Sequence, residues 1–141
     1  LTAETCVEEI SLLDGELIDC RGCAYEMCLH YGEQSACFYG GHMVESVYPA
    51  LKRCNALLLV WPNYNDAVGA NMAAFFNRLT ALFRSEYDSF AAKRVYALVV
   101  SGYSGGDIVA EQIASKISCY RRILPSLRRH TNRRAFLRVK R

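Results

Sequence analysis

Of the 141 residues in the chain, 52% are hydrophobic and 22% are charged, a balance that suits one globular domain with a substantial core. No apolar run approaches the length of a membrane span and no signal peptide is recognisable, which argues against a membrane protein. The seven cysteines are an odd number, so we expect reduced thiols in the cytoplasm or a metal site rather than a disulfide framework.

Charge is distributed very unevenly along the chain. Residues 1–111 hold all 14 acidic side chains and 7 basic ones, whereas residues 112–141 hold 10 basic side chains and no acidic one. Because the composition breaks abruptly, we expect residues 1–117 to form the domain and residues 118–141 to be a poorly ordered basic tail. Clustered arginines could also form a nucleic-acid-binding arm, but the break in composition favours a foreign end.

The first part of the chain predicts a strand and a helix on either side of a cysteine-rich segment. Residues 6–13 alternate modestly and predict a strand, which a turn at Asp14-Gly15 ends. Residues 19–41, rich in cysteine, glycine and tyrosine, predict an irregular insertion. Apolar residues over 43–54 have helical spacing, and Pro49 must either kink this helix or lie in its first turn.

Residues 56–84 predict a strand, a polar loop and a helix in succession. The apolar run at 56–61 is typical of a buried parallel strand, and Pro62 ends it. Apolar residues then recur at helical spacing over 67–84, with Asp66 placed to cap the helix.

A second unit of the same kind follows. Residues 94–101 predict a strand, residues 101–106 a glycine-rich loop, and residues 106–117 a helix. Because strands alternate with helices, we expect an α/β fold in which strands 56–61 and 94–101 are parallel neighbours. Ligands bind such open sheets at the carboxyl ends of the strands, where both loops lie.

Four motifs occur along the chain: a cysteine turn, a Pro-x-Tyr turn, a helix end and a glycine loop. They read Ile18-Asp19-Cys20-Arg21-Gly22-Cys23, Pro62-Asn63-Tyr64, Phe75-Phe76-Asn77-Arg78 and Ser101-Gly102-Tyr103-Ser104-Gly105-Gly106-Asp107. With these motifs in this order, residues 5–117 resemble the NAD(P)H-dependent FMN reductases, a family that includes the iron-sulfur flavoproteins. The family pattern Lys-x-Phe-x-Asp-Arg has Lys and Asp where this chain has Ala73 and Asn77.

The resemblance implies a flavodoxin-like, three-layer α/β/α fold with a parallel sheet. Strands two, three and four of that fold would be residues 6–13, 56–61 and 94–101. Strand one with its phosphate-binding loop, and strand five, have no counterpart in the sequence. We therefore expect a flavodoxin-like domain that is incomplete.

The resemblance also implies a function: hydride transfer from NAD(P)H to FMN, and electron transfer from the flavin to an acceptor or an iron-sulfur centre. The residues expected to hold FMN are Pro62, Asn63, Tyr64, Asn65, Asp66, Gly102, Tyr103, Ser104, Gly105 and Gly106. Relatives usually form dimers, so self-association is expected, without a membrane or nucleic acid as partner.

Each flavin loop has a physical argument and a simpler alternative. Trp61 and Tyr64 can supply an aromatic wall for the flavin ring, and glycines in the second loop permit close approach of the backbone. Alternatively, Trp61 is a core residue and both loops are ordinary connections. No acid–base or nucleophilic residue stands out, which fits an enzyme whose cofactor performs the chemistry.

Cys20, Cys23, Cys28 and Cys37 are the candidate metal ligands, with spacing C-x2-C-x4-C-x8-C. Four thiolates can hold an iron-sulfur cluster or a tetrahedral zinc ion, and plain thiols are the third reading. The similar iron-sulfur flavoproteins space their first three cysteines more tightly. If FMN does not bind without the phosphate loop, the alternative function is a non-enzymatic degenerate fragment or a cysteine-based metal-binding module.

Overall fold

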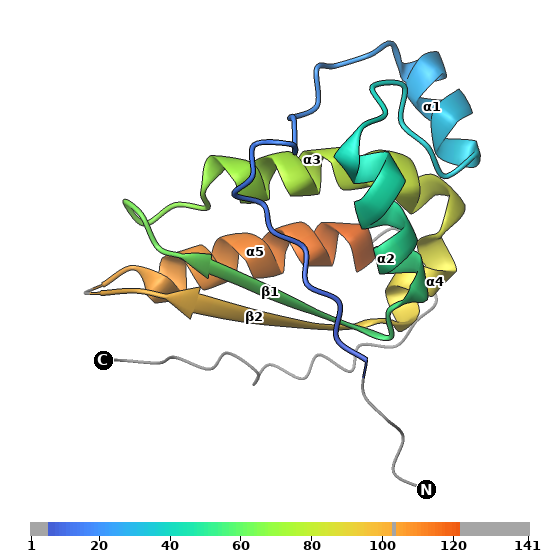
Figure 1. Ribbon diagram of the computed structural model, residues 1–141. Coiled ribbons are helices and arrows are strands. Elements are labelled where there is room, and N and C mark those ends of the chain that lie inside the picture. The colour runs from blue at the N-terminus through green and yellow to red at the C-terminus, as the bar shows by residue number, and fades with distance from the viewer. Residues whose placement is uncertain (1–5, 103, 122–141) are drawn as a thin grey trace, which may run out of the picture.

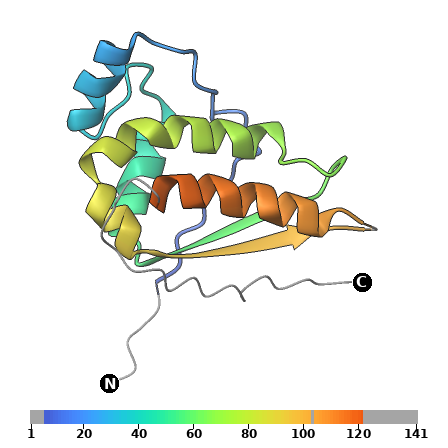
Figure 2. The same cartoon turned by 180° about the vertical axis from the view of Figure 1, so that it is seen from behind.

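The computed structural model describes residues 6–102 and 104–121. In chain order the elements are α1 (Tyr25–Glu33), a short π-helix η1 (Met43–Val47), α2 (Tyr48–Arg53), β1 (Ala56–Pro62), α3 (Ala70–Ser85), α4 (Tyr87–Ala92), β2 (Arg94–Val100) and α5 (Gly106–Arg121). The helices α3 and α5 lie on one side of the two strands in both views (Figure 1, Figure 2). The described part is therefore an α/β arrangement with one layer of helices.

The predicted parallel pairing of the two strands is confirmed. β1 and β2 run in the same direction, in register from Ala56 opposite Arg94 to Pro62 opposite Val100. A parallel pair requires a long crossover connection, which α3 and α4 supply. The two loops that follow β1 and β2 consequently emerge at the same edge of the sheet.

The two faces of the sheet have different surroundings. Leu59 and Trp61 belong to the core beneath the helices. On the opposite face Leu58, Val60 and Tyr96 are exposed, with Leu58 directly opposite Tyr96 in the register. The described residues thus leave one apolar face of the sheet open to solvent.

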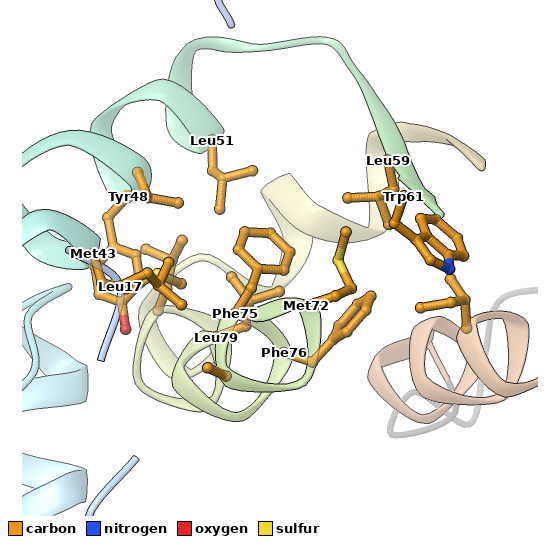
Figure 3. Close-up of a cluster of buried hydrophobic side chains, with 14 of the residues drawn as sticks. Leu17, Met43, Tyr48, Leu51, Leu59, Trp61, Met72, Phe75, Phe76 and Leu79 are labelled. Atoms are coloured by element: carbon orange, nitrogen blue, oxygen red, sulfur yellow. The ribbon is translucent and has the colours of Figure 1, made fainter. Parts of the chain in front are cut away.

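The core forms where α3 meets α2 and the sheet (Figure 3). Its labelled side chains come from four parts of the chain: Leu17, Met43, Tyr48, Leu51, Leu59, Trp61, Met72, Phe75, Phe76 and Leu79. Complete burial of an apolar side chain of this size contributes about 1.5–3 kcal/mol. Packing on both sides fixes α3, which is the element that reaches both candidate sites.

The strand predicted at residues 6–13 is wrong. The segment has no ladder partner among the described residues, because both strands of the sheet pair only with each other there. It is held by side chains instead: Ile10 and Leu12 pack against the core, and the Asn71 side-chain amide donates to the Leu12 carbonyl oxygen at 2.7 Å. Of the three strands expected from the resemblance, the described residues therefore form two.

The cysteine-rich segment is more regular than predicted, since residues 25–33 form α1. The helix predicted over 43–54 is confirmed as η1 followed directly by α2. Pro49 lies in the first turn of α2, one of the two positions that the sequence left open for it.

The helices differ from the predictions in three respects. α3 begins at Ala70 with Gly69 as its N-cap, so Asp66 does not cap it. The connection between α3 and β2 contains the short helix α4. α5 continues to Arg121, four residues past the expected domain boundary at 117, and residues 122–141 of the predicted tail lie outside the described part.

No helix within the described ranges is long and apolar enough to cross a bilayer.

Candidate flavin and metal sites

The loops after β1 and β2 contact each other directly at the carboxyl edge of the sheet. The backbone N–H of Asn63 donates to the Val100 carbonyl oxygen at 2.8 Å, which extends the strand pairing by one residue. The Asn63 side-chain amide lies 2.8 Å from the Ser104 carbonyl oxygen and 3.1 Å from the Ser101 hydroxyl. Asn63 therefore ties the first predicted flavin loop to the second.

The first loop contains a tight turn with two residues in the left-handed region. Asn65 and Asp66 have φ of 55° and 52°, and the Ala67 N–H donates to the Tyr64 carbonyl oxygen at 3.2 Å. Positive φ at both central residues is typical of a type I′ turn. After glycine, Asn and Asp are the residues that tolerate this region best. The turn leaves Tyr64 68% exposed at the carboxyl end of β1.

The backbone conformation of residue 105 and its contact with Asp66 both favour glycine at this position. Its φ is +76°, and a Cβ placed there would lie 1.4 Å from Oδ1 of Asp66. The space beside Gly105 is thus filled by the Asp66 carboxyl group, so this glycine does not provide the approach to a planar ligand that the sequence suggested. Gly102 has no atom within 4 Å of such a Cβ and remains open.

The predicted aromatic wall is half wrong. Trp61 is 5% exposed and lies in the core between β1 and α5 (Figure 3), because inward-facing positions alternate along β1. Of these two aromatic residues, Tyr64 is the exposed one. Of the other predicted residues, Tyr103 lies outside the described part, whereas Pro62, Asn63, Asn65, Asp66, Gly102, Ser104, Gly105 and Gly106 all lie in or beside the two joined loops.

Of the four predicted metal ligands, Cys28 lies in the first turn of α1, where its backbone N–H donates to the carbonyl oxygen of the N-cap residue Ala24 at 3.0 Å. Cys20 and Cys23 precede the helix, and Cys37 follows it. Gly22, with φ of 69°, turns the chain between Cys20 and Cys23. Burial raises the pKa of the Cys28 thiol, and the neighbouring thiols of Cys23, Cys20 and Cys37 raise it further. α1 and its flanking turns therefore carry the four cysteines in one segment, but no three of these sulfur atoms lie within 4.8 Å of one another.

The cysteine segment is anchored to the middle of α3. The Asn77 side-chain amide donates to Oδ1 of Asp19 at 3.0 Å, and the Arg78 guanidinium donates to the Gly40 carbonyl oxygen at 2.7 Å. The Tyr48 hydroxyl donates to the Arg78 carbonyl oxygen. Burial raises the pKa of Tyr48, whose surroundings also include Cys37 and Cys28. α3 thus connects the core, the flavin loops and the cysteines.

A family model described as NADPH-dependent FMN reductase matches residues 1–126. The chain belongs to the NADPH-dependent FMN reductase family. Its parallel β1–β2 pair and crossover helix are accordingly part of a flavodoxin-like α/β fold, as predicted.

The chain is also similar to a curated iron-sulfur flavoprotein from Archaeoglobus fulgidus. The two are 32% identical over 96 residues, which cover 67% of this chain and 46% of the relative. The match thus spans less than half the length of that flavoprotein. No solved structure gives a significant match.

In this member of the FMN reductase family, the motif at residues 75–78 lies in the middle of α3, which continues to Ser85, and its residues have structural contacts. Phe75 and Phe76 are core residues, while Asn77 and Arg78 hold the cysteine segment. Sequence reasoning identified these four residues only as a family motif. The apolar face of α3 signals the two phenylalanines, but no sequence signal indicates that Arg78 is buried.

Sequence reasoning also missed a group formed by Asp14, Glu16 and His42. One ligand atom of each lies within 4.8 Å of the others, and Nδ1 of His42 is 3.2 Å from Oε2 of Glu16. The turn at Gly15 brings the two carboxylates together, but His42 lies far along the chain. Both carboxylates are exposed, so the group consists of a pair between His42 and Glu16 with Asp14 beside it.

Proposed function

We propose that the chain is the flavin-ring half of an FMN-dependent NAD(P)H oxidoreductase. The observation that carries this proposal is the direct joining of the two loops at the carboxyl edge of the sheet by Asn63, with Tyr64 exposed beside them. This edge is where open α/β sheets bind ligands. Membership in the FMN reductase family supports FMN as the ligand.

The residues present fit the flavin ring in part. Tyr64 would pack against a ring face, and the open backbone of Gly102 would face its polar edge, while Asn63 joins the two loops. When bound, FMN accepts a hydride from a nicotinamide nucleotide and passes the electrons to an acceptor. The protein contributes position and shielding of the ring.

The phosphate group of FMN sets the affinity. A phosphate-binding loop supplies several hydrogen bonds to a charged group, each worth about 1.5–3 kcal/mol. Without three of them the binding free energy would fall by about 4–9 kcal/mol, and each 1.4 kcal/mol is a tenfold change in Kd. We therefore expect the chain by itself to bind FMN in the micromolar range or more weakly.

FMN titration followed by flavin fluorescence tests the flavin site. Tyr64→Ala is expected to weaken binding by about 1–3 kcal/mol, the loss found when an aromatic side chain that stacks on a planar ring is removed. Tyr25→Ala is the matched control, because Tyr25 is similarly exposed but lies on α1, and it should leave the Kd unchanged. Absence of binding at millimolar FMN would overturn the flavin proposal.

The four cysteines are proposed as a metal centre that holds an iron-sulfur cluster or zinc. The position of all four on α1 and the turns that flank it supports this, as does similarity to an iron-sulfur flavoprotein. Visible absorbance and metal content of the purified protein separate the two metals, since a cluster is coloured and zinc is not. If the chain binds metal but no FMN, the alternative of a cysteine-based metal-binding module is the better description.

Self-association is the last part of the proposal, with a second copy of the chain covering the open face of the sheet. Leu58 and Val60 are apolar, adjacent on that face and exposed. Val60→Lys is therefore expected to convert a dimer into a monomer in sedimentation velocity experiments. Ile108→Lys, at a comparably exposed position on α5, is the control that should leave the dimer intact. A wild-type chain that sediments as a monomer would contradict self-association.

A further inference from the structure

The Gln112 side chain of α5 holds the first flavin loop by two hydrogen bonds. Its Oε1 atom accepts from the backbone N–H of Val68 at 3.2 Å, and its Nε2 atom donates to the carbonyl oxygen of Asp66 at 3.2 Å. A side-chain amide carries one acceptor and two donors, so a single glutamine can bond to both kinds of backbone group. The loop is therefore joined to a helix that follows it by more than forty residues in sequence.

The two hydrogen bonds fall on the part of the loop whose backbone conformation is least favourable. Asn65 and Asp66 both have positive φ. The Ala67 N–H closes this turn by donating to the Tyr64 carbonyl oxygen at 3.2 Å. Residues other than glycine keep a left-handed conformation only where their surroundings stabilise it. The Gln112 amide supplies such stabilisation at the end of the turn.

Tyr64 lies between two points at which the first loop is held. Before it, the Asn63 side chain donates to the Ser104 carbonyl oxygen of the second loop at 2.8 Å. After it, the Gln112 side chain bonds to the last part of the turn. β1 and β2 end at the same side of the molecule, next to the start of α5 (Figure 1, Figure 2). The exposed Tyr64 side chain is thus presented by a backbone that is held on both sides.

We infer that Gln112 is a positioning residue for the flavin ring and that it acts through Tyr64, by holding the turn that presents the phenol ring. This rests on the proposed function. On a turn that is not held, the ring would sample several directions, and the apparent affinity would fall with the fraction of molecules in the binding direction. A loop that is ordered before binding avoids this loss, because the ligand does not have to order it.

FMN titration of the isotope-labelled full-length chain, followed by NMR chemical shifts, tests the inference up to millimolar FMN. Gln112→Met removes both hydrogen bonds at nearly constant side-chain length. It should raise the Kd about 5- to 30-fold, the effect of losing two hydrogen bonds of ordinary strength. Gln112→Leu removes the same bonds with a side chain of different shape and should have a similar effect.

Combination with Tyr64→Ala separates positioning of the ring from general support of the loop. If Gln112 acts through the ring, Gln112→Met should change the Kd less than about twofold in a chain that already carries Tyr64→Ala. A role in loop stability alone would raise the Kd by the same factor in both backgrounds. Equal factors therefore overturn the positioning role.

Ser115→Met is the matched control, because it introduces the same residue on the same helix without a change of charge. Ser115 is exposed and lies farther along α5 from the two loops. Its replacement should leave the Kd of FMN unchanged. A rise in Kd equal to that of Gln112→Met would show that any change in α5 weakens binding, which contradicts a specific role of Gln112.

Hydrogen exchange of the Val68 N–H, measured without FMN, tests the hold on the loop separately. This N–H donates to Gln112, so it should exchange faster in Gln112→Met than in the wild type, and an unchanged rate would overturn the inference. If the wild type binds FMN but Gln112→Met and Gln112→Leu bind it equally well, only the role of Gln112 is overturned. If the wild type shows no binding at millimolar FMN, the proposed flavin site is wrong, and the positioning role is overturned with it.

Discussion

Replacing Phe75 with alanine is expected to lower the free energy of unfolding by about 3–5 kcal/mol. Phe75 is 4% exposed and points from α3 toward Leu51 of α2, and its ring packs edge-on against that of Phe76 (Figure 3). The substitution removes a large apolar side chain from the contact between two helices and leaves a cavity that the surrounding core cannot fill. Urea unfolding followed by circular dichroism measures the change.

Ile108→Ala on α5 is the control for this prediction. Ile108 is exposed, so its truncation should change the free energy of unfolding by no more than about 0.5 kcal/mol. Because total stability of a small domain is about 5–15 kcal/mol, the Phe75 variant should unfold at far lower urea concentration. A Phe75 variant as stable as the control would show that α3 does not pack on α2 as described.

The second large effect is expected for Gly105→Ala, which should destabilise the protein by about 2–5 kcal/mol. A left-handed backbone costs a residue other than glycine about 1–2 kcal/mol, and overpacking adds about 1–3 kcal/mol. The added Cβ would overlap the Asp66 carboxyl group, so this side chain must leave the position that it occupies between the two loops. The thermal midpoint and the FMN affinity should therefore fall together.

A double variant separates the two contributions. Asp66→Gly combined with Gly105→Ala removes the carboxyl group that the new Cβ meets, so it should recover the overpacking part of the loss, about 1–3 kcal/mol, and leave the backbone part. If the stability change of the double variant equals the sum of the changes in the two single variants, Gly105 and Asp66 do not contact each other as the structure shows.

These two predictions concern the parts of the fold that hold the proposed flavin site in place. α3 begins just after the first loop and ends beneath the cysteine segment, so its packing sets the positions of both. Asn63 and Gly105 then set the distance between the flavin loops. The structure places both candidate sites on elements that share one core, although they lie far apart in sequence.

Local patterns in the sequence sufficed for the central units of the fold. The apolar runs at 56–61 and 94–101 predict β1 and β2, because short apolar runs bounded by turn signals are typical of parallel strands. The helical spacing of Val68, Met72 and Phe75 predicts α3, because apolar residues at this spacing form one face of a helix that packs against the core. The strand predicted at 6–13 failed because strand formation needs a partner, and modest alternation alone does not provide one.

The sequence by itself determined the family, the parallel α/β class and the residues of the two candidate sites, since motifs and spacing are local properties of the chain. Tertiary structure decided where those residues lie and what they contact. It placed Trp61 in the core and left Tyr64 exposed, because alternate positions of β1 face opposite sides. It also buried Arg78 against the two ends of the cysteine segment, a contact between residues about forty to sixty positions apart that no local pattern encodes.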